Sequence, residues 1–169
     1  MKPIRLHLGC GLRKLEGYIN CDISKDVNPD IVVDIANLSK KFKPNSVDEI
    51  LIEHTLEHVK DFEKAMKEMH KVLKPSGRTV IVVPYAGIAS AFHPYHFWYF
   101  SKESFDPFHK DDWRRHYYDF HFSKVETKLV FDSWMKFISW FANRKYWFYE
   151  NSFLVRLFPA KELRVELIK

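Results

Sequence analysis

The sequence predicts one α/β domain built on a doubly wound, mostly parallel sheet of seven strands. Short apolar segments rich in β-branched residues recur along the chain, as buried parallel strands require. Apolar residues at helical spacing separate two of these segments, and the length of 169 residues suits a single domain. Right-handed crossovers between parallel strands would place a ligand beyond the carboxyl ends of the strands.

Seven segments have the composition of strands, five in the first half of the chain and two near its end. They cover residues 4–8, 18–22, 30–34, 48–53, 79–83, 124–130 and 162–168. Apolar side chains over residues 62–73 follow helical spacing, and the KPSG sequence at 74–77 ends this predicted helix in a turn. A further short helix, capped by Ser101, is expected within the aromatic stretch 85–124.

The composition narrows the class of protein and its partners. Apolar residues make up 46% and charged residues 29%, which is globular composition, and no apolar run approaches the roughly 20 residues of a membrane-spanning helix. A strand already by residue 4 leaves no room for a signal peptide, so a cytoplasmic protein with Cys10 and Cys21 reduced is expected. The net charge of +5 suits an anionic partner, but the basic residues are scattered, so nucleic acid is not indicated.

Glycines and carboxylates follow the first three predicted strands. The LHLGCG sequence at 6–11 places two glycines where the first strand ends, so that a ligand can approach the backbone amides. Asp22 and Asp34 end the next two strands at the same edge of the sheet. A carboxylate at the end of the second strand can accept hydrogen bonds from both hydroxyls of a ribose. In the alternative interpretation, the glycine turn is structural and Asp22 only caps a turn.

The order of these motifs resembles the class I S-adenosylmethionine-dependent methyltransferases, closest to small members whose first helix is reduced to a loop. The matching segments lie within residues 4–84 and read LHLGCG, GYINCDIS, DIVVDIANL, FKPNSVDEILIEHTLEHV, EMHKVLKPSG and VIVVP. The resemblance implies a Rossmann-like methyltransferase fold, a methyl-transferring enzyme and S-adenosyl-L-methionine as cofactor. Residues 4–84 would then bind the cofactor, and residues 85–169 would form the acceptor side of a single domain spanning 1–169.

The resemblance also implies which residues contact the cofactor. These are His7, Gly9, Cys10, Gly11, Asp22, Ile23, Asp34, Ile35, Glu53 and His54. Gly9 to Gly11 would line the methionine part of the cofactor, Asp22 its ribose, and Asp34 with Ile35 its adenine. Glu53 and His54 would face its sulfonium end.

The sequence departs from the family pattern at two positions. His7 stands where the family usually has an acidic residue, and Arg13 stands at the usual third glycine. Few residues separate Gly11 from Asp22, whereas a full crossover takes at least about 10 to 12 residues including its helix. The pocket is therefore expected to be open on that side. A dinucleotide site is disfavoured because Lys14 occupies the position of its third glycine.

Histidines after the fourth and fifth strands are candidates for the chemistry. Glu53, His54, His93 and His96 could remove a proton from a hydroxyl or amine acceptor, and a core aromatic cluster is the alternative for the latter two. The HTLEH sequence at 54–58 also has the letters of an inverted zinc-protease motif. It directly follows a strand, as the methyltransferase motif does, so we expect no metal.

The acceptor cannot be read from the sequence, and a small molecule is favoured over a macromolecule. A non-catalytic methyltransferase-like binding or scaffold domain is the alternative function. Residues 134–158 contain ten aromatic residues and form a predicted insertion with an apolar helical stripe. This segment is expected to cover the acceptor site, to join two subunits of a homodimer, or to contact a membrane surface weakly. In the alternative, the protein is a monomer and this segment packs on the sheet of its own domain.

Overall fold

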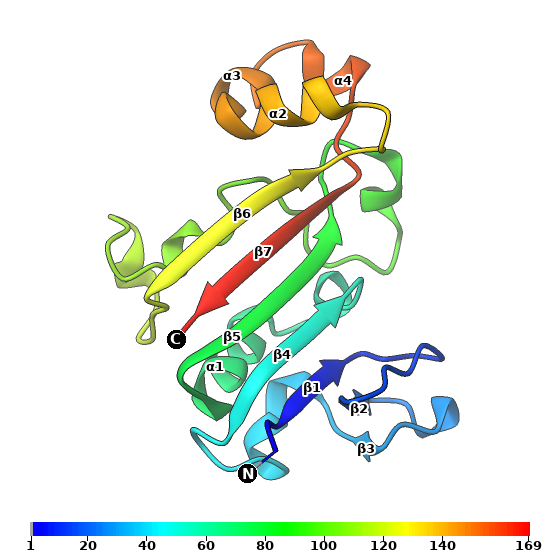
Figure 1. The fold of residues 1–169 in the computed structure, drawn as a ribbon, viewed down its shortest axis with the longest axis vertical. Coiled ribbons are helices and arrows are strands. Elements are labelled where there is room, and N and C mark those ends of the chain that lie inside the picture. The colour runs from blue at the N-terminus through cyan, green and yellow to red at the C-terminus, as the bar shows by residue number, and fades with distance from the viewer. Residues whose placement is uncertain (1) are drawn as a thin grey trace.

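A computed structural model describes residues 2–169 as a seven-stranded sheet with the strand order β3-β2-β1-β4-β5-β7-β6 (Figure 1). The strands are β1 (Arg5–Leu8), β2 (Ile19–Asp22), β3 (Ile31–Val32), β4 (Val47–Glu53), β5 (Leu73–Pro84), β6 (Lys124–Val130) and β7 (Glu162–Ile168). β7 runs antiparallel to both of its neighbours, and the other neighbouring strands pair in parallel. The predicted fold class is confirmed.

The strand boundaries follow the predictions closely, except at β3 and β5. β6 and β7 occupy the predicted ranges, whereas only Ile31–Val32 of the predicted third strand pairs. β5 begins six residues before the predicted residue 79, because Leu73 already pairs with Val47 before the turn that follows the helix. In that turn Ser76 has a φ of 63°, and its N–H donates to the backbone oxygen of Lys169.

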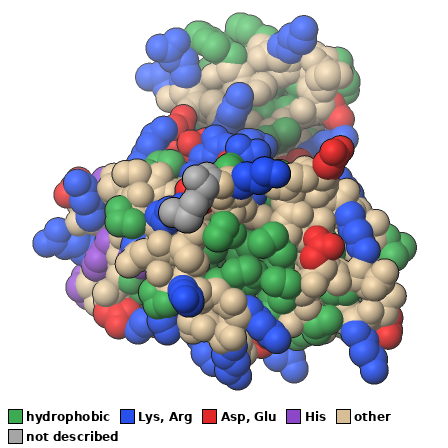
Figure 2. Space-filling view, turned by 60° about the horizontal axis from the view of Figure 1, so that its bottom comes forward, with side chains coloured by type: hydrophobic (Ala, Val, Ile, Leu, Met, Phe, Trp, Pro, Cys, Tyr) green, Lys and Arg blue, Asp and Glu red, His purple; other side chains and the backbone are tan. Residues whose placement is uncertain are grey.

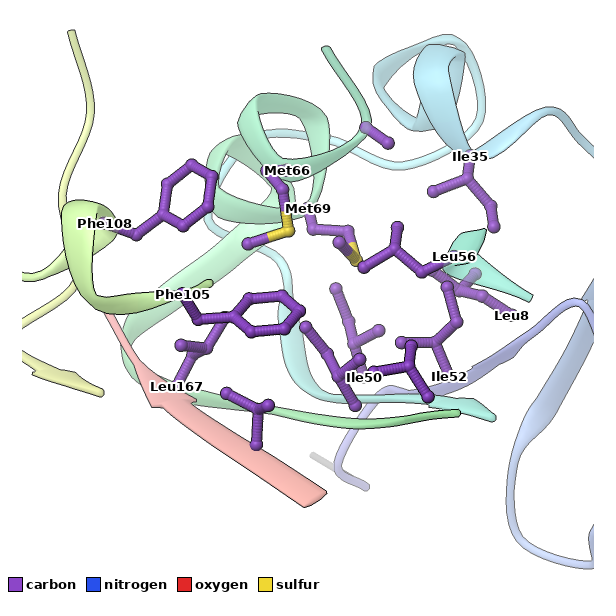
Figure 3. Packing of buried hydrophobic residues seen from close by; sticks show 14 of the residues in the cluster. Leu8, Ile35, Ile50, Ile52, Leu56, Met66, Met69, Phe105, Phe108 and Leu167 are labelled. Carbon is purple, nitrogen blue, oxygen red and sulfur yellow. The ribbon is translucent and has the colours of Figure 1, made fainter. Parts of the chain in front are cut away.

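One long helix covers the sheet face that holds the main core. α1 (Phe62–Val72) begins at Asp61, whose carboxylate accepts a hydrogen bond from the backbone N–H of Lys64. Its apolar side chains are buried, and Met66 and Met69 point toward side chains of the sheet (Figure 3). The predicted helix over 62–73 is confirmed.

Short 3₁₀ helices make up most of the remaining connections. They are η1 (Lys25–Val27), η2 (Ile35–Lys40), η3 (Leu56–His58), η4 (Ala89–Phe92), η5 (Asp106–Phe108) and η6 (Arg115–Tyr117).

The prediction of a helix that starts at Ser101 is wrong. The backbone N–H of Ser101 donates to the hydroxyl of Ser104 at 2.9 Å, and turns lead from there into η5. Phe105 and Phe108 are fully buried, and both rings lie about 6 Å from that of Phe62 in α1. Packing of these rings into the core fixes the chain in turns, although Ser101 has the local chemistry of a helix cap.

The opposite face of the sheet has no helix from the first crossover. Between β1 and β2 the described chain forms turns only, which confirms the predicted shortening of the first crossover helix. This face carries polar groups instead. Glu49 on β4 accepts hydrogen bonds from the Tyr18 hydroxyl and, at 2.7 Å, from the guanidinium of Arg78. These contacts let the face meet water without a covering helix.

Residues 134–158 form a helical lobe beyond the end of β6 rather than on a sheet face (Figure 1). The lobe contains α2 (Lys136–Arg144), α3 (Tyr146–Glu150) and α4 (Leu154–Leu157). The Asn143 side chain binds the backbone N–H and C=O of Leu129 at 2.8 and 2.9 Å, which fastens α2 to β6. Among residues 2–169, no helix is long and apolar enough to cross a membrane.

Large apolar side chains of the lobe face solvent. The predicted apolar stripe comprises Trp134, Phe137, Ile138, Phe141 and Phe148. Of these, Trp134 and Phe137 are 73% and 72% exposed, so these two side chains do not pack on the sheet of their own chain. The other exposed ones are Trp140, Trp147, Phe148, Phe153 and Leu157. Hydrophobic side chains stand beside lysines and arginines on the lobe, seen at the top of Figure 2. The same view shows basic side chains scattered over the rest of the surface.

Candidate functional site

A cavity of about 430 Å³ opens at the carboxyl ends of the first strands. It is lined by Gly9, Cys21, Asp22, Ile23, Val33, Asp34, Ile35, Ala36, His54, Thr55, His58, Val59, Lys60 and Asp61. Its volume suits a ligand the size of a nucleoside derivative, since small-molecule pockets measure about 300–1,000 Å³. We call it the first cavity. It brings together six of the ten residues assigned to cofactor contacts from the sequence.

The glycine turn closes tightly against the segment after β4. Gly9 has a φ of 65°, and a Cβ built there would lie 2.2 Å from side-chain atoms of Thr55. Gly11 has a φ of 49° and donates its backbone N–H to Asp22 Oδ2 at 2.9 Å. Glycine at position 9 therefore lets the turn pack against Thr55, and glycine at both positions permits the positive φ.

The carboxylates after β2 and β3 are oriented by the backbone. Asp22 Oδ1 accepts a hydrogen bond from the N–H of Ser24, and Asp34 Oδ1 accepts one from the N–H of Ala36, each at 2.9 Å. Each oxygen retains a second lone pair for a ligand. Next to them, burial raises the pKa of the Cys21 thiol to about 12, so this thiol stays protonated at neutral pH.

Four assigned cofactor residues do not line the first cavity. They are His7, Cys10, Gly11 and Glu53. His7 is buried in the sheet, with its Nδ1 3.3 Å from Asn20 Oδ1. Glu53 forms an ion pair with Arg13 at 2.7 Å, so the residue at the unusual third-glycine position ties the loop to β4. The role of all four residues toward a cofactor stays a prediction.

The sequence interpretation missed the remaining contribution of the segment after β4. Thr55, His58 and Lys60 also line the first cavity, although only Glu53 and His54 had been assigned there. The sequence could have indicated these residues, because they follow the end of a strand, as the assigned residues do. Leu12 and Ile23, beside the shortened crossover, are 88% and 70% exposed, as an open side of the pocket would require.

A second cavity of about 440 Å³ adjoins the first. It is lined by His54, Glu57, His58, Pro84, Ile88, Ser90, His93, His96, Lys161 and Glu162. His54 and His58 line both cavities. The structure therefore gathers three of the four predicted proton-transfer residues, His54, His93 and His96, and leaves Glu53 outside.

Hydrogen bonds orient the rings of this histidine cluster. His54 Nε2 lies 3.1 Å from Glu162 Oε1. The ring of His96 lies 4.6 Å from that of His58 and 5.4 Å from that of His93. Burial raises the pKa of the neighbouring Glu57 carboxyl above its ordinary value.

Comparison with known proteins agrees with this architecture. Residues 6–81 match a methyltransferase domain family. A search of curated protein sequences found no match.

Three solved structures share the fold at low sequence identity. A S-adenosylmethionine-dependent methyltransferase from Archaeoglobus fulgidus is 17% identical with a TM-score of 0.67, over 99% of this chain and 86% of that one. A complex of the Trm112 methyltransferase activator with a putative methyltransferase from Haloferax volcanii is 15% identical in sequence with a TM-score of 0.63. The match covers 99% of this chain and 82% of that one.

The third is phosphoethanolamine N-methyltransferase 2 of Haemonchus contortus, bound to phosphomonomethylethanolamine and S-adenosylhomocysteine. It is 14% identical in sequence with a TM-score of 0.62. The match covers all of this chain but only half of the Haemonchus contortus chain. The domain matched at residues 6–81 and the shared fold support a class I methyltransferase that uses S-adenosylmethionine as its cofactor.

Proposed function

We propose that this methyltransferase modifies a small molecule bound in the second cavity while S-adenosylmethionine occupies the first. The observation that supports this proposal is that His54 and His58 line both cavities, which therefore adjoin each other. An acceptor held among these histidines would lie beside the end of the first cavity where the cofactor would offer its methyl group, so that the acceptor could displace it directly from the sulfur. The cavity of about 440 Å³ suits a small acceptor better than a macromolecule.

The residues of the first cavity fit the cofactor. The backbone at Gly9 would face its methionine part, the carboxylate of Asp22 its ribose hydroxyls, and Asp34 with Ile35 its adenine. When bound, the cofactor supplies an electrophilic methyl group on a sulfonium. The task left to the chain is to align the acceptor and to remove its proton.

Histidines of the second cavity are suited to accept that proton. His54, His93 and His96 line this cavity, and a neutral imidazole can accept the proton released by a hydroxyl or amine at the cavity wall. Glu162 would orient the His54 ring, because its Oε1 lies 3.1 Å from Nε2. These residues would position the acceptor as well as deprotonate it.

Calorimetric titration tests this function against the alternative of a scaffold domain. We expect S-adenosylhomocysteine and S-adenosylmethionine each to bind with a stoichiometry of one, and the latter to be turned over slowly without acceptor. A folded protein with no affinity for either compound would contradict the enzyme and favour the scaffold. A crystal structure with S-adenosylhomocysteine would then show the shape of the acceptor space beside its sulfur.

We also propose that the lobe of residues 134–158 rests on an anionic membrane surface. Its exposed tryptophans and phenylalanines can enter the headgroup region, and its four basic residues outnumber its single glutamate. A second copy of the chain is a poorer occupant, because a symmetric contact would bring these positive lobes together. Association through so small an element would be weak and reversible.

Sedimentation with vesicles tests the lobe. We expect the protein to sediment with vesicles containing phosphatidylserine and to remain in solution with purely zwitterionic ones. The double variant Trp134→Ser/Phe137→Ser should lose at least half of the sedimented fraction, because both side chains are exposed in the lobe. Trp113→Ser is the matched control, since Trp113 is 76% exposed but lies outside the lobe.

Two outcomes would contradict the membrane proposal. One is a monomer by light scattering that ignores anionic vesicles. The other is a stable dimer that the double variant separates, which would assign the lobe to a subunit interface.

A further inference from the structure

Three side chains of the second cavity converge as metal ligands would. Glu57, His58 and His96 each offer one ligand atom, and these atoms all lie within 4.8 Å of one another. Two come from η3, and His96 comes from the connection after β5. Two imidazoles and one carboxylate form a ligand set that proteins use for divalent transition metals while leaving coordination positions open.

Backbone hydrogen bonds fix both imidazoles in a ligating form. His58 Nδ1 lies 3.0 Å from the carbonyl oxygen of Tyr95, and His96 Nδ1 lies 2.8 Å from that of Ala91. A carbonyl oxygen only accepts, so each Nδ1 must carry the proton. Each Nε2 is therefore left with a lone pair when the ring is neutral. This arrangement of a second ring nitrogen on a carbonyl is typical of metal-bound histidines.

Glu57 supplies an observation independent of the histidines. Its residue is 1% exposed, and its Oε2 has no hydrogen-bond partner within the described residues. The His54 ring is 3.8 Å from Oε1, beyond hydrogen-bonding distance. A buried carboxylate oxygen without a partner costs free energy unless something binds it. A cation between Glu57, His58 and His96 would satisfy this oxygen.

We propose that Glu57, His58 and His96 bind a divalent transition-metal ion at the wall between the two cavities. This inference revises the expectation of no metal drawn from the sequence, where the HTLEH motif was assigned only to the methyltransferase pattern. Nitrogen ligands favour Zn²⁺ and Co²⁺ over Mg²⁺, which prefers oxygen.

The metal would select acceptors that carry oxygen. Its open positions would face the second cavity, where a hydroxyl oxygen could coordinate and lose its proton more easily. That proton would pass to a free imidazole of the cavity, such as His93. This role rests on the proposed methyl transfer, whereas metal binding itself does not.

Metal titration of the whole chain tests the site. After dialysis against a chelator, we expect the protein to bind one equivalent of Zn²⁺ and one of Co²⁺ by calorimetry, with at least tenfold weaker binding of Mg²⁺. Glu57→Gln and His96→Ala should each weaken Zn²⁺ binding at least tenfold. His116→Ala is the matched control, because Nδ1 of His116 also lies near a carbonyl oxygen, at 3.2 Å, but outside the cavity.

A second readout keeps the test independent of activity. Zn²⁺ should raise the melting temperature of the native chain and of His116→Ala, and should leave that of Glu57→Gln unchanged. If Glu57→Gln does not fold, His96→Ala decides. Binding well below one equivalent, or unchanged affinity in the folded variants, would overturn the metal site. S-adenosylhomocysteine affinity without metal binding refutes only the metal, and metal binding without that affinity refutes only the proposed function.

Discussion

Gly9→Ala is expected to abolish measurable cofactor binding and to lower the free energy of unfolding by about 2–4 kcal/mol. The added Cβ would lie 2.2 Å from Thr55 Oγ1 and Cγ2, a distance that no pair of unbonded heavy atoms tolerates. Thr55 cannot move freely, because its hydroxyl donates to the backbone oxygen of Glu53 at 2.8 Å. The turn and the segment after β4 must therefore separate, and both line the first cavity.

Gly17→Ala is the matched control for this clash. Gly17 also has a positive φ, of 79°, but a Cβ there meets no atom within 4 Å, and Gly17 does not line the first cavity. The control should cost only the backbone strain of about 1–2 kcal/mol and should retain cofactor binding. Urea unfolding and calorimetry with S-adenosylhomocysteine measure both effects. Equal losses in the two variants would show that strain alone, and not contact with Thr55, explains the requirement for glycine.

Asp22→Ala is expected to weaken cofactor binding by about 1.5–3 kcal/mol, which is roughly ten- to a hundredfold. Hydrogen bonds from ribose hydroxyls to a carboxylate would be lost. In addition, the backbone N–H groups of Gly11 and Ser24 would lose the acceptor that holds both loops at the cavity.

The variants Asp22→Asn and Asp26→Ala separate these two effects. Asparagine keeps one acceptor oxygen, so a loss intermediate between wild type and Asp22→Ala is expected. Asp26→Ala removes a carboxylate from η1, outside the first cavity, and should leave the affinity unchanged. An unaltered affinity in Asp22→Ala, with a native circular dichroism spectrum, would exclude the ribose role.

The sequence predicted those features that depend on local pattern. β7 alternates between buried and more exposed residues, and β6 begins with an alternation of exposed and half-buried ones. Asp22 and Asp34 were found because parallel strands end at one sheet edge. The boundary of β5 was missed because its first pair, Leu73 with Val47, joins segments far apart in the chain.

Contacts between distant segments could not be predicted from local pattern. The ion pair of Arg13 with Glu53 joins residues 40 positions apart, and the approach of Gly9 to Thr55 joins residues 46 positions apart. Likewise, the HTLEH letters gave no sign that His96, from another connection, would lie beside Glu57. Such pairs depend on how β4 and the loops pack, which a single sequence does not reveal.

The loop that replaces the first crossover helix has a consequence for turnover. Because Leu12 and Ile23 at that side of the first cavity are largely exposed, the spent cofactor can depart without waiting for a helix or lid to swing away. We expect a short residence time for S-adenosylhomocysteine, with an exchange rate that depends little on solvent viscosity beyond simple diffusion. Release of the methylated acceptor from the second cavity would then be the rate-limiting step of the catalytic cycle.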